Sequence, residues 1–140
     1  MAEVVIDANG ILSAAFGAKP LEAMVRAFED HKVYLSQTIG RELQGVILRL
    51  SKKLSKEQFL FLQEKIRQLL SLAKPISVST HVVLSRDAKD DYYLSLCKEV
   101  QADFLITGDK DFLNISQENL KKNGISCQIV SPQEFLEKIS

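Results

Sequence analysis

The stretch FLITGDKDFL, residues 104–113, changes from apolar to acidic within a few residues. Its first four residues are apolar or β-branched, which is typical of a strand that is buried on both faces. A glycine ends this run, and Asp109 and Asp111 follow with one lysine between them. Residues 3–7 repeat the arrangement, because Asp7 closes the short apolar run EVVI. The sequence therefore predicts two buried strands that each carry a carboxylate at the carboxyl end.

Strands and helices alternate along the rest of the chain, as judged from apolar spacing, capping patterns and β-branched runs. The predicted strands are residues 3–7, 32–36, 104–107 and 126–130, with a strand or extended connection at 78–85. The predicted helices are residues 21–30, about 38–51, 59–73, 89–101, 116–124 and 131–139. This alternation predicts a single α/β domain, residues 1–140, with a mostly parallel sheet and helices on both faces.

Composition excludes several classes of protein. With 46% hydrophobic and 26% charged residues, the chain has the balance of a globular protein. No apolar run approaches the roughly 20 residues of a membrane span, and the N-terminal segment lacks the pattern of a secretion signal. We therefore expect a cytoplasmic protein without a membrane partner. Cys97 and Cys127 are then expected to be buried free thiols.

The net charge of zero hides a local asymmetry. Residues 41–67 carry seven basic and three acidic side chains, whereas residues 86–111 carry seven acidic and four basic ones. A basic excess over the whole chain, which is usual for nucleic-acid-binding proteins, is absent. The basic segment is either a solvated helix face or a surface for an RNA backbone. The candidate RNA-binding residues are Arg49, Lys52, Lys53, Lys89 and Lys110.

Acidic residues from four places should meet at one edge of the predicted sheet, because helix starts and strand ends share that edge. These residues are Asp7, Glu42, the group Asp87, Asp90 and Asp91, and the pair Asp109 and Asp111. Each also has a structural explanation as a helix cap, a dipole partner, a solvated side chain or a turn residue. Asp7 is the hardest to explain in this way, since an acid that closes a buried strand needs a partner.

Converging carboxylates require a cation. Two unit charges at 4 Å repel by about 4 kcal/mol at an effective dielectric constant near 20, and such repulsion raises pKa values. An all-oxygen set of ligands selects Mg²⁺ or Mn²⁺ over zinc, which prefers His and Cys. The chain has only two histidines and no C-x-x-C pair. A bound Mg²⁺ or Mn²⁺ can activate water against a phosphodiester and neutralise charge on the phosphate.

Four segments in chain order resemble the PIN domain family, in particular its branch of VapC-like toxins of type II toxin–antitoxin systems. They are VVIDANGILSA (4–14), GRELQGVI (40–47), RDAKDDYYLSLCKEVQADFLITGDKDFL (86–113) and IVSPQEFL (129–136). The elements D-x-x-D-D-x-x-x-L and T-G-D-K-D in the third segment are the most specific. The resemblance implies a three-layer α/β/α fold and a metal-dependent endoribonuclease that cleaves single-stranded RNA with an acidic cluster.

The resemblance also implies the role of each residue. The third acid of the family falls on Asp90, because that acid lies seven residues before a small buried residue, here Cys97. The implied catalytic residues are Asp7, Glu42, Asp90 and Asp109, which with Asp111 are also the implied metal ligands. Asn9 is implied to support the first aspartate, and Thr107 is the hydroxyl residue beside the fourth acid.

Two positions depart from the family pattern. Ala8 stands where threonine is usual, and Cys97 replaces a common alanine. Neither departure removes a carboxylate, so an active site is expected.

The resemblance implies three partners: single-stranded RNA, an antitoxin whose segment covers the acidic cleft, and a second copy in a homodimer. Two alternatives stay open. In the first, the chain is a catalytically silent PIN-like module that binds RNA or protein. In the second, it is another α/β phosphotransfer enzyme, such as a phosphatase or receiver domain. The T-G-D-K-D element fits the phosphotransfer enzymes poorly.

Overall fold

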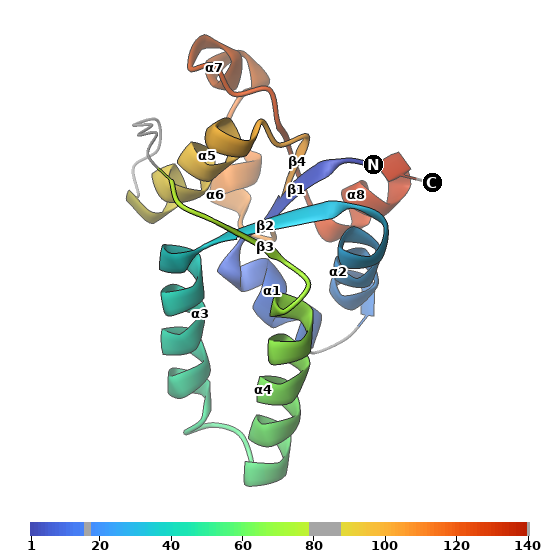
Figure 1. The fold of residues 1–140 in the computed structure, drawn as a ribbon, viewed down its shortest axis with the longest axis vertical. Coiled ribbons are helices and arrows are strands. Elements are labelled where there is room, and N and C mark those ends of the chain that lie inside the picture. The colour runs from blue at the N-terminus through green and yellow to red at the C-terminus, as the bar shows by residue number, and fades with distance from the viewer. Residues whose placement is uncertain (16–17, 79–87, 140) are drawn as a thin grey trace.

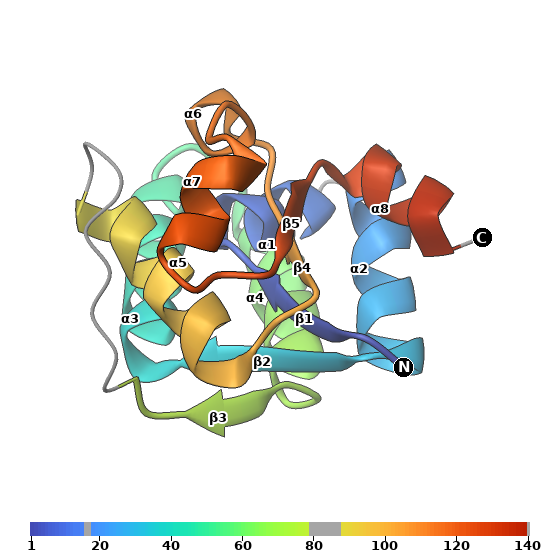
Figure 2. The same ribbon diagram turned by 90° about the horizontal axis from the view of Figure 1, so that it is seen from above.

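Parallel strands form one central sheet in the order β3-β2-β1-β4-β5 (Figures 1 and 2). A computed structural model describes residues 1–15, 18–78 and 88–139. The strands are β1 (Glu3–Ile6), β2 (Lys32–Ser36), β3 (Lys74–Ile76), β4 (Phe104–Ile106) and β5 (Gln128–Val130). The helices are α1 (Ala8–Ala15), α2 (Ala18–Asp30), α3 (Gln37–Leu50), α4 (Lys56–Leu70), α5 (Ala88–Val100), α6 (Lys110–Leu113), α7 (Gln117–Lys122) and α8 (Pro132–Ile139).

The strand order reverses at β1. From β1 the chain first adds β2 and β3 on one side and later adds β4 and β5 on the other. In the register of β1 and β4, Val4 lies opposite Phe104 and Ile6 opposite Ile106. The carboxyl ends of these two neighbours therefore lie side by side, at the point where open parallel sheets bind their ligands.

Helices cover both faces of the sheet. Val4 and Ile6 of β1 belong to a core cluster with residues of α1, α2, α4 and α8, whereas Val5 faces a second cluster with residues of α5, α6 and α7. Helix α3 contributes Leu43 to the first cluster and Ile39 to the second. Both faces of β1 are buried, which explains its continuous apolar run. The predicted three-layer α/β/α fold with a parallel sheet is confirmed.

Local capping patterns predicted several helix starts correctly. Ser55 and Gln58 form a capping box before α4, as do Ser131 and Glu134 before α8. After α7, Gly124 adopts a φ of 74°, a conformation that favours glycine.

The sequence missed three elements. Helices α1 and α6 were not predicted. Strand β3 was also missed, because the helix predicted to reach residue 73 ends at Leu70 and the strand follows it. The predicted extended segment 78–85 lies almost wholly outside the described residues. In the segment FLFL (59–62) of α4, Leu62 is buried, whereas Leu60 and Phe61 are exposed.

The cysteines, the histidines and the length of the helices can be compared with the sequence in the same way. Cys97 and Cys127 are buried free thiols, as predicted. His31 accepts a hydrogen bond from the Ala2 amide and packs edge-on against Phe135, and His81 lies outside the described residues. In the described ranges, no helix combines the length and apolar character needed to span a bilayer.

Phe135 should be a major contributor to stability. It is 0% exposed and makes edge-on contacts with His31 and Phe104, with ring centroids 5.8 and 5.5 Å apart. Phe135→Ala should lower the free energy of unfolding by about 3–5 kcal/mol in urea titrations. Phe61→Ala, which truncates a 65% exposed ring on α4, should change it by less than about 0.5 kcal/mol. Equal losses in the two variants would contradict the assigned core.

Candidate active site

Four carboxylates line one cavity of about 210 Å³ at the carboxyl edge of the sheet. Asp7 follows β1, Glu42 lies in the second turn of α3, Asp90 lies in the first turn of α5, and Asp109 follows β4. The sequence predicted that these four residues would share an edge of the sheet, and the structure brings them to one cavity. The remaining lining residues are Ala8, Asn9, Val46, Arg49, Tyr93 and Phe112.

Asp7 is the most deeply placed of the four acids, with 2% of its surface exposed. Its Oδ1 accepts a hydrogen bond from the Gly10 amide at 2.6 Å. The Gly10 amide is an otherwise unpaired donor in the first turn of α1, so Asp7 is the N-cap of that helix. This cap stabilises a helix start whose first turn, with Asn9 and Gly10, has little helix propensity of its own.

Thr107 holds the other oxygen of Asp7 and connects it to the fourth acid. The fully buried Thr107 hydroxyl donates to Asp7 Oδ2 at 2.5 Å and accepts from the Asp109 amide at 3.0 Å. One hydroxyl therefore fixes a carboxylate after β1 and the backbone after β4. For Asn9, which is exposed on the cavity lining, the supporting role stays a prediction.

Gly10 is required by the close approach of α1 to this carboxylate. A Cβ atom at position 10 would lie 2.9 Å from Asp7 Oδ1 and 3.0 Å from Ile6 Cγ2. Any side chain there would displace the carboxylate or the strand.

Burial raises the pKa of Asp7 from its ordinary value of 3.8 to about 6. The hydrogen bonds from Thr107 and Gly10 lower the pKa, but loss of solvation outweighs them, and the nearby charges of Asp109 and Glu42 raise it further. The cavity therefore disfavours the ionised form of its deepest carboxyl group.

Helix α3 presents one line of residues to the cavity. Glu42, Val46 and Arg49 are spaced four and three residues apart and so lie on the same helix face. Arg49 is the one basic residue among the described lining residues, beside four acidic ones. Among the predicted RNA-binding residues, Arg49 alone is a lining residue of this cavity in the described part of the chain.

Tyr93 is a lining residue that the sequence did not single out. It lies three residues after Asp90 and hence on the same face of α5. Its hydroxyl accepts from the Ala8 amide at 2.9 Å and donates to Glu42 Oε2 at 3.2 Å. Burial, together with the nearby Glu42 and Asp7 charges, raises the pKa of Tyr93 well above its ordinary value, so the phenol stays neutral. The i,i+3 spacing from Asp90 was the available clue.

The other predicted RNA-binding residues are not among the residues that line the cavity, or their side chains lie outside the described residues. Lys52 and Lys53 follow the end of α3, more than about 12 Å along the helix axis from Glu42. Lys110 is exposed at the start of α6. The side chains of Lys89 and Asp111, and the whole of Asp87, lie outside the described residues.

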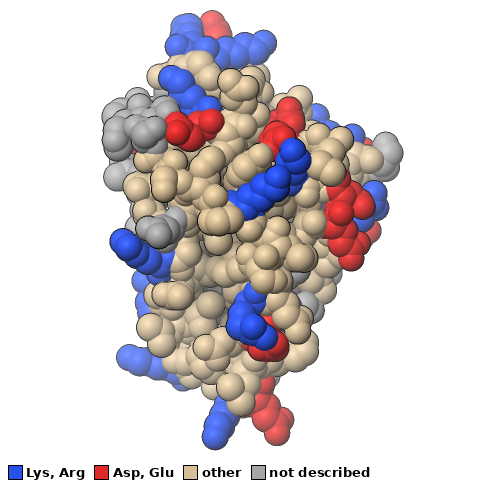
Figure 3. Space-filling view, in the orientation of Figure 1, with Lys and Arg blue, Asp and Glu red and all other residues tan. Residues whose placement is uncertain are grey.

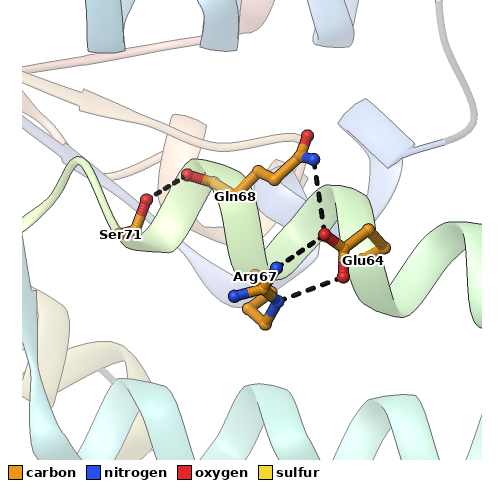
Figure 4. A network of polar contacts seen from close by, with 4 residues as sticks. All are labelled: Glu64, Arg67, Gln68 and Ser71. Carbon is orange, nitrogen blue, oxygen red and sulfur yellow. Dashed lines mark hydrogen bonds and ion pairs between the residues drawn. The ribbon is translucent and has the colours of Figure 1, made fainter.

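One basic residue of the segment 41–67 is already paired in the folded chain. Arg67 of α4 donates two hydrogen bonds to the Glu64 carboxylate, at 3.1 and 2.6 Å (Figure 4). On the face shown in Figure 3, Lys and Arg form separate groups among uncharged residues. This face therefore offers separate local contacts for a phosphate and not a continuous basic band.

The cavity fits a hard divalent cation by its donor chemistry. Its four acidic lining residues supply only oxygen ligands, the type that Mg²⁺ and Mn²⁺ prefer. Within the described ranges, no three acidic, His or Cys side chains converge closely enough to hold an ion by themselves. Mg²⁺ retains several waters when one or two carboxylates bind it, so this looser arrangement is compatible with that ion.

A family model for the PIN domain matches residues 3–111, a span that includes all four carboxylates of the cavity. The chain belongs to the PIN domain family. PIN domains are generally nucleases, and these generally use Mg²⁺ or Mn²⁺. The family match thus supports a hydrolytic function for the acidic cavity.

A solved structure shares this fold over almost the whole chain. The crystal structure of PAE2754 from Pyrobaculum aerophilum is 10% identical in sequence and superimposes with a TM-score of 0.63. The similarity covers 99% of this chain and 96% of that one. No curated protein sequence matches the chain.

The ionisation of Asp7 should make the protein less stable at neutral pH when divalent cations are absent. The folded state retains a proton on Asp7 up to a pH of about 6, whereas the unfolded chain releases it near 3.8. The free energy of unfolding therefore falls as the pH rises through this window, by about 3 kcal/mol in total. Between pH 4.5 and 7.5, urea titrations with EDTA should show about 2 kcal/mol of this loss in the wild type and none of it in Asp7→Asn.

A suitable control is Glu22→Gln, which removes an exposed carboxylate on α2. It should follow the wild-type pH dependence. Parallel losses in wild-type protein and Asp7→Asn would contradict the raised pKa.

Proposed function

We propose that this PIN domain is a divalent-metal-dependent endoribonuclease that hydrolyses single-stranded RNA, and that it is the toxin of a type II toxin–antitoxin pair. The observation that carries the nuclease proposal is the cavity itself. The acidic residues at positions 7, 42, 90 and 109 line one cavity, and two hydrogen bonds fix the carboxylate of the most buried one, Asp7. A buried acid whose pKa is raised beside other acids is typical of functional sites.

In this proposal Mg²⁺ or Mn²⁺ is held, directly or through water, by Asp7, Asp90 and Asp109. Asp111 adjusts the shell of ligands around the ion. When bound, such an ion neutralises charge on the phosphate and lowers the pKa of a coordinated water. Thr107 keeps Asp7 and the Asp109 backbone at a fixed separation through its shared hydroxyl. Glu42, on the opposite wall supplied by α3, orients the attacking water or assists a second ion.

Arg49 is the proposed contact for the RNA backbone. It lies two helical turns from Glu42 on the same face of α3, so a phosphate bound by its guanidinium lies beside the carboxylates. Lys52, Lys53, Lys89 and Lys110 are proposed to add weaker, longer-range attraction.

The toxin role rests on the resemblance of the sequence motifs to VapC-like proteins. It implies an antitoxin that covers the acidic cavity and a homodimer. The exposed apolar side chains of Leu48, Leu60 and Phe61 on α3 and α4 offer surface that a protein partner would bury.

The direct test is cleavage of a mixed-sequence single-stranded RNA by the purified protein in Mn²⁺, Mg²⁺ or EDTA. Cleavage should require a divalent cation and leave 5′-phosphate and 3′-hydroxyl ends, because water attacks the phosphorus in line and the 3′-oxygen leaves. Asp7→Asn should reduce the rate by about 100-fold or more, the scale of a lost transition-state contact of roughly 3 kcal/mol. Glu22→Gln should cleave like the wild type.

Two results would contradict this function. Cleavage in EDTA that yields a 2′,3′-cyclic phosphate would exclude hydrolysis by activated water. Absence of cleavage with every ion, in folded protein free of any antitoxin, would favour the binding module without catalysis. One observation agrees with that alternative, namely that no three of the described metal-binding side chains converge tightly.

Arg49 should contribute to RNA binding more than other arginines. In the inactive Asp7→Asn background, Arg49→Gln should weaken RNA binding and reduce the slope of log affinity against log salt by about one. Arg67→Gln is the matched control, because Arg67 is already paired with Glu64 on α4. Fluorescence anisotropy between roughly 50 and 200 mM salt measures both slopes. Equal slopes for the two variants would remove Arg49 from the RNA contact.

A further inference from the structure

Tyr93 connects three elements at the cavity through one hydroxyl group. The residue is 3% exposed, and its ring packs edge-on against Phe112 with centroids 6.0 Å apart. Its hydroxyl lies between the Ala8 amide at the start of α1 and the Glu42 carboxylate on α3. The hydroxyl therefore joins α5 to the segment after Asp7 and to the opposite cavity wall.

The direction of these two hydrogen bonds is fixed by the backbone. Ala8 is the first residue of α1, so its amide has no carbonyl partner within the helix and donates to the phenol oxygen. A phenol has one proton to donate, and the Ala8 amide cannot accept it. The proton therefore points to Glu42 Oε2, which accepts it at 3.2 Å.

We propose that Tyr93 is a positioning residue of the nuclease site, which holds the Glu42 carboxylate against the cavity by a hydrogen bond whose direction the Ala8 amide sets. The inference rests on the proposed nuclease function and adds to it a residue that positions Glu42. Thr107 fixes Asp7 and the Asp109 segment, whereas Tyr93 fixes Glu42 relative to the residue that follows Asp7. Both walls of the cavity are then tied to the carboxyl end of β1.

The neighbouring Tyr92 provides a matched control. It also joins α5 to α3 through its hydroxyl, which accepts from Thr38 Oγ1 at 2.9 Å. However, Tyr92 is 40% exposed and is not among the residues that line the cavity. Phenylalanine at either position retains the ring and removes one hydroxyl that bridges the same two helices.

The test is a double-mutant cycle of Tyr93→Phe and Glu42→Gln, with Tyr92→Phe beside it. In metal-dependent RNA cleavage, Tyr93→Phe should lower kcat about tenfold or more, the scale of one hydrogen bond to a charged group, and change KM by less than about threefold. In the Glu42→Gln background the same substitution should change kcat by less than about twofold, because the effect passes through Glu42. Tyr92→Phe should stay within about twofold of wild type.

A second readout needs neither metal nor RNA. The Ala8 amide resonance in ¹H–¹⁵N spectra should shift in Tyr93→Phe and also in Glu42→Gln, because both changes alter the hydroxyl that accepts from it. It should not shift in Tyr92→Phe. Thermal unfolding of each variant shows that the fold is retained.

The outcomes separate the two proposals. A wild-type protein that cleaves no RNA with any ion overturns the nuclease function and this role with it. An active wild type in which the Tyr93→Phe and Glu42→Gln losses simply multiply overturns the positioning role alone. If the Ala8 resonance does not shift in Glu42→Gln, the positioning role is also overturned, since the Tyr93 hydroxyl would then not connect the Ala8 amide to the Glu42 carboxylate.

Discussion

The burial of the Asp7 carboxyl group is the constraint on which the rest of the site depends. Asp7 stands where β1 and β4 end side by side, and it is almost without solvent. Two donors replace the lost water, the Gly10 amide and the Thr107 hydroxyl. These contacts in turn require a residue without Cβ at position 10 and a hydroxyl residue at the end of β4.

The hydrogen bonds do not compensate fully for burial, because the pKa of Asp7 remains about 6. An apolar residue in this place would avoid the penalty and also serve the core. The nearby acids increase the penalty, since Asp109 and Glu42 both raise the pKa of Asp7. A cluster that destabilises the folded chain unless a cation is present is easier to understand as a functional site than as a structural one.

The sequence predicted four of the five strands, with Asp7 and Asp109 at strand ends, because local residues carry these signals, whereas Asp90 was singled out by the family resemblance. A strand buried on both faces has a continuous apolar run; Asp7 directly follows one such run, and Asp109 follows another after Thr107 and Gly108. The start of α1 was missed because its first turn contains Asn9 and Gly10, which are poor helix formers, and its stabilising cap is the side chain of Asp7. Tyr93 was missed because a buried tyrosine next to an acid is ordinary in sequence, and its significance lies in contacts with residues 51 and 85 positions away.

Topology explains why acids so far apart in the chain share one cavity. In a parallel sheet every strand ends, and the following helix begins, at the same edge, so α3 and α5 bring Glu42 and Asp90 to the edge where β1 and β4 end. This convergence makes the cavity anionic in a chain whose net charge is zero. An RNA phosphate approaching it meets one guanidinium, from Arg49, and four carboxylates. In the proposed nuclease, productive RNA binding and catalysis therefore both depend on a cation held by these carboxylates, and neither the chain's overall charge nor its scattered surface lysines substitutes for it.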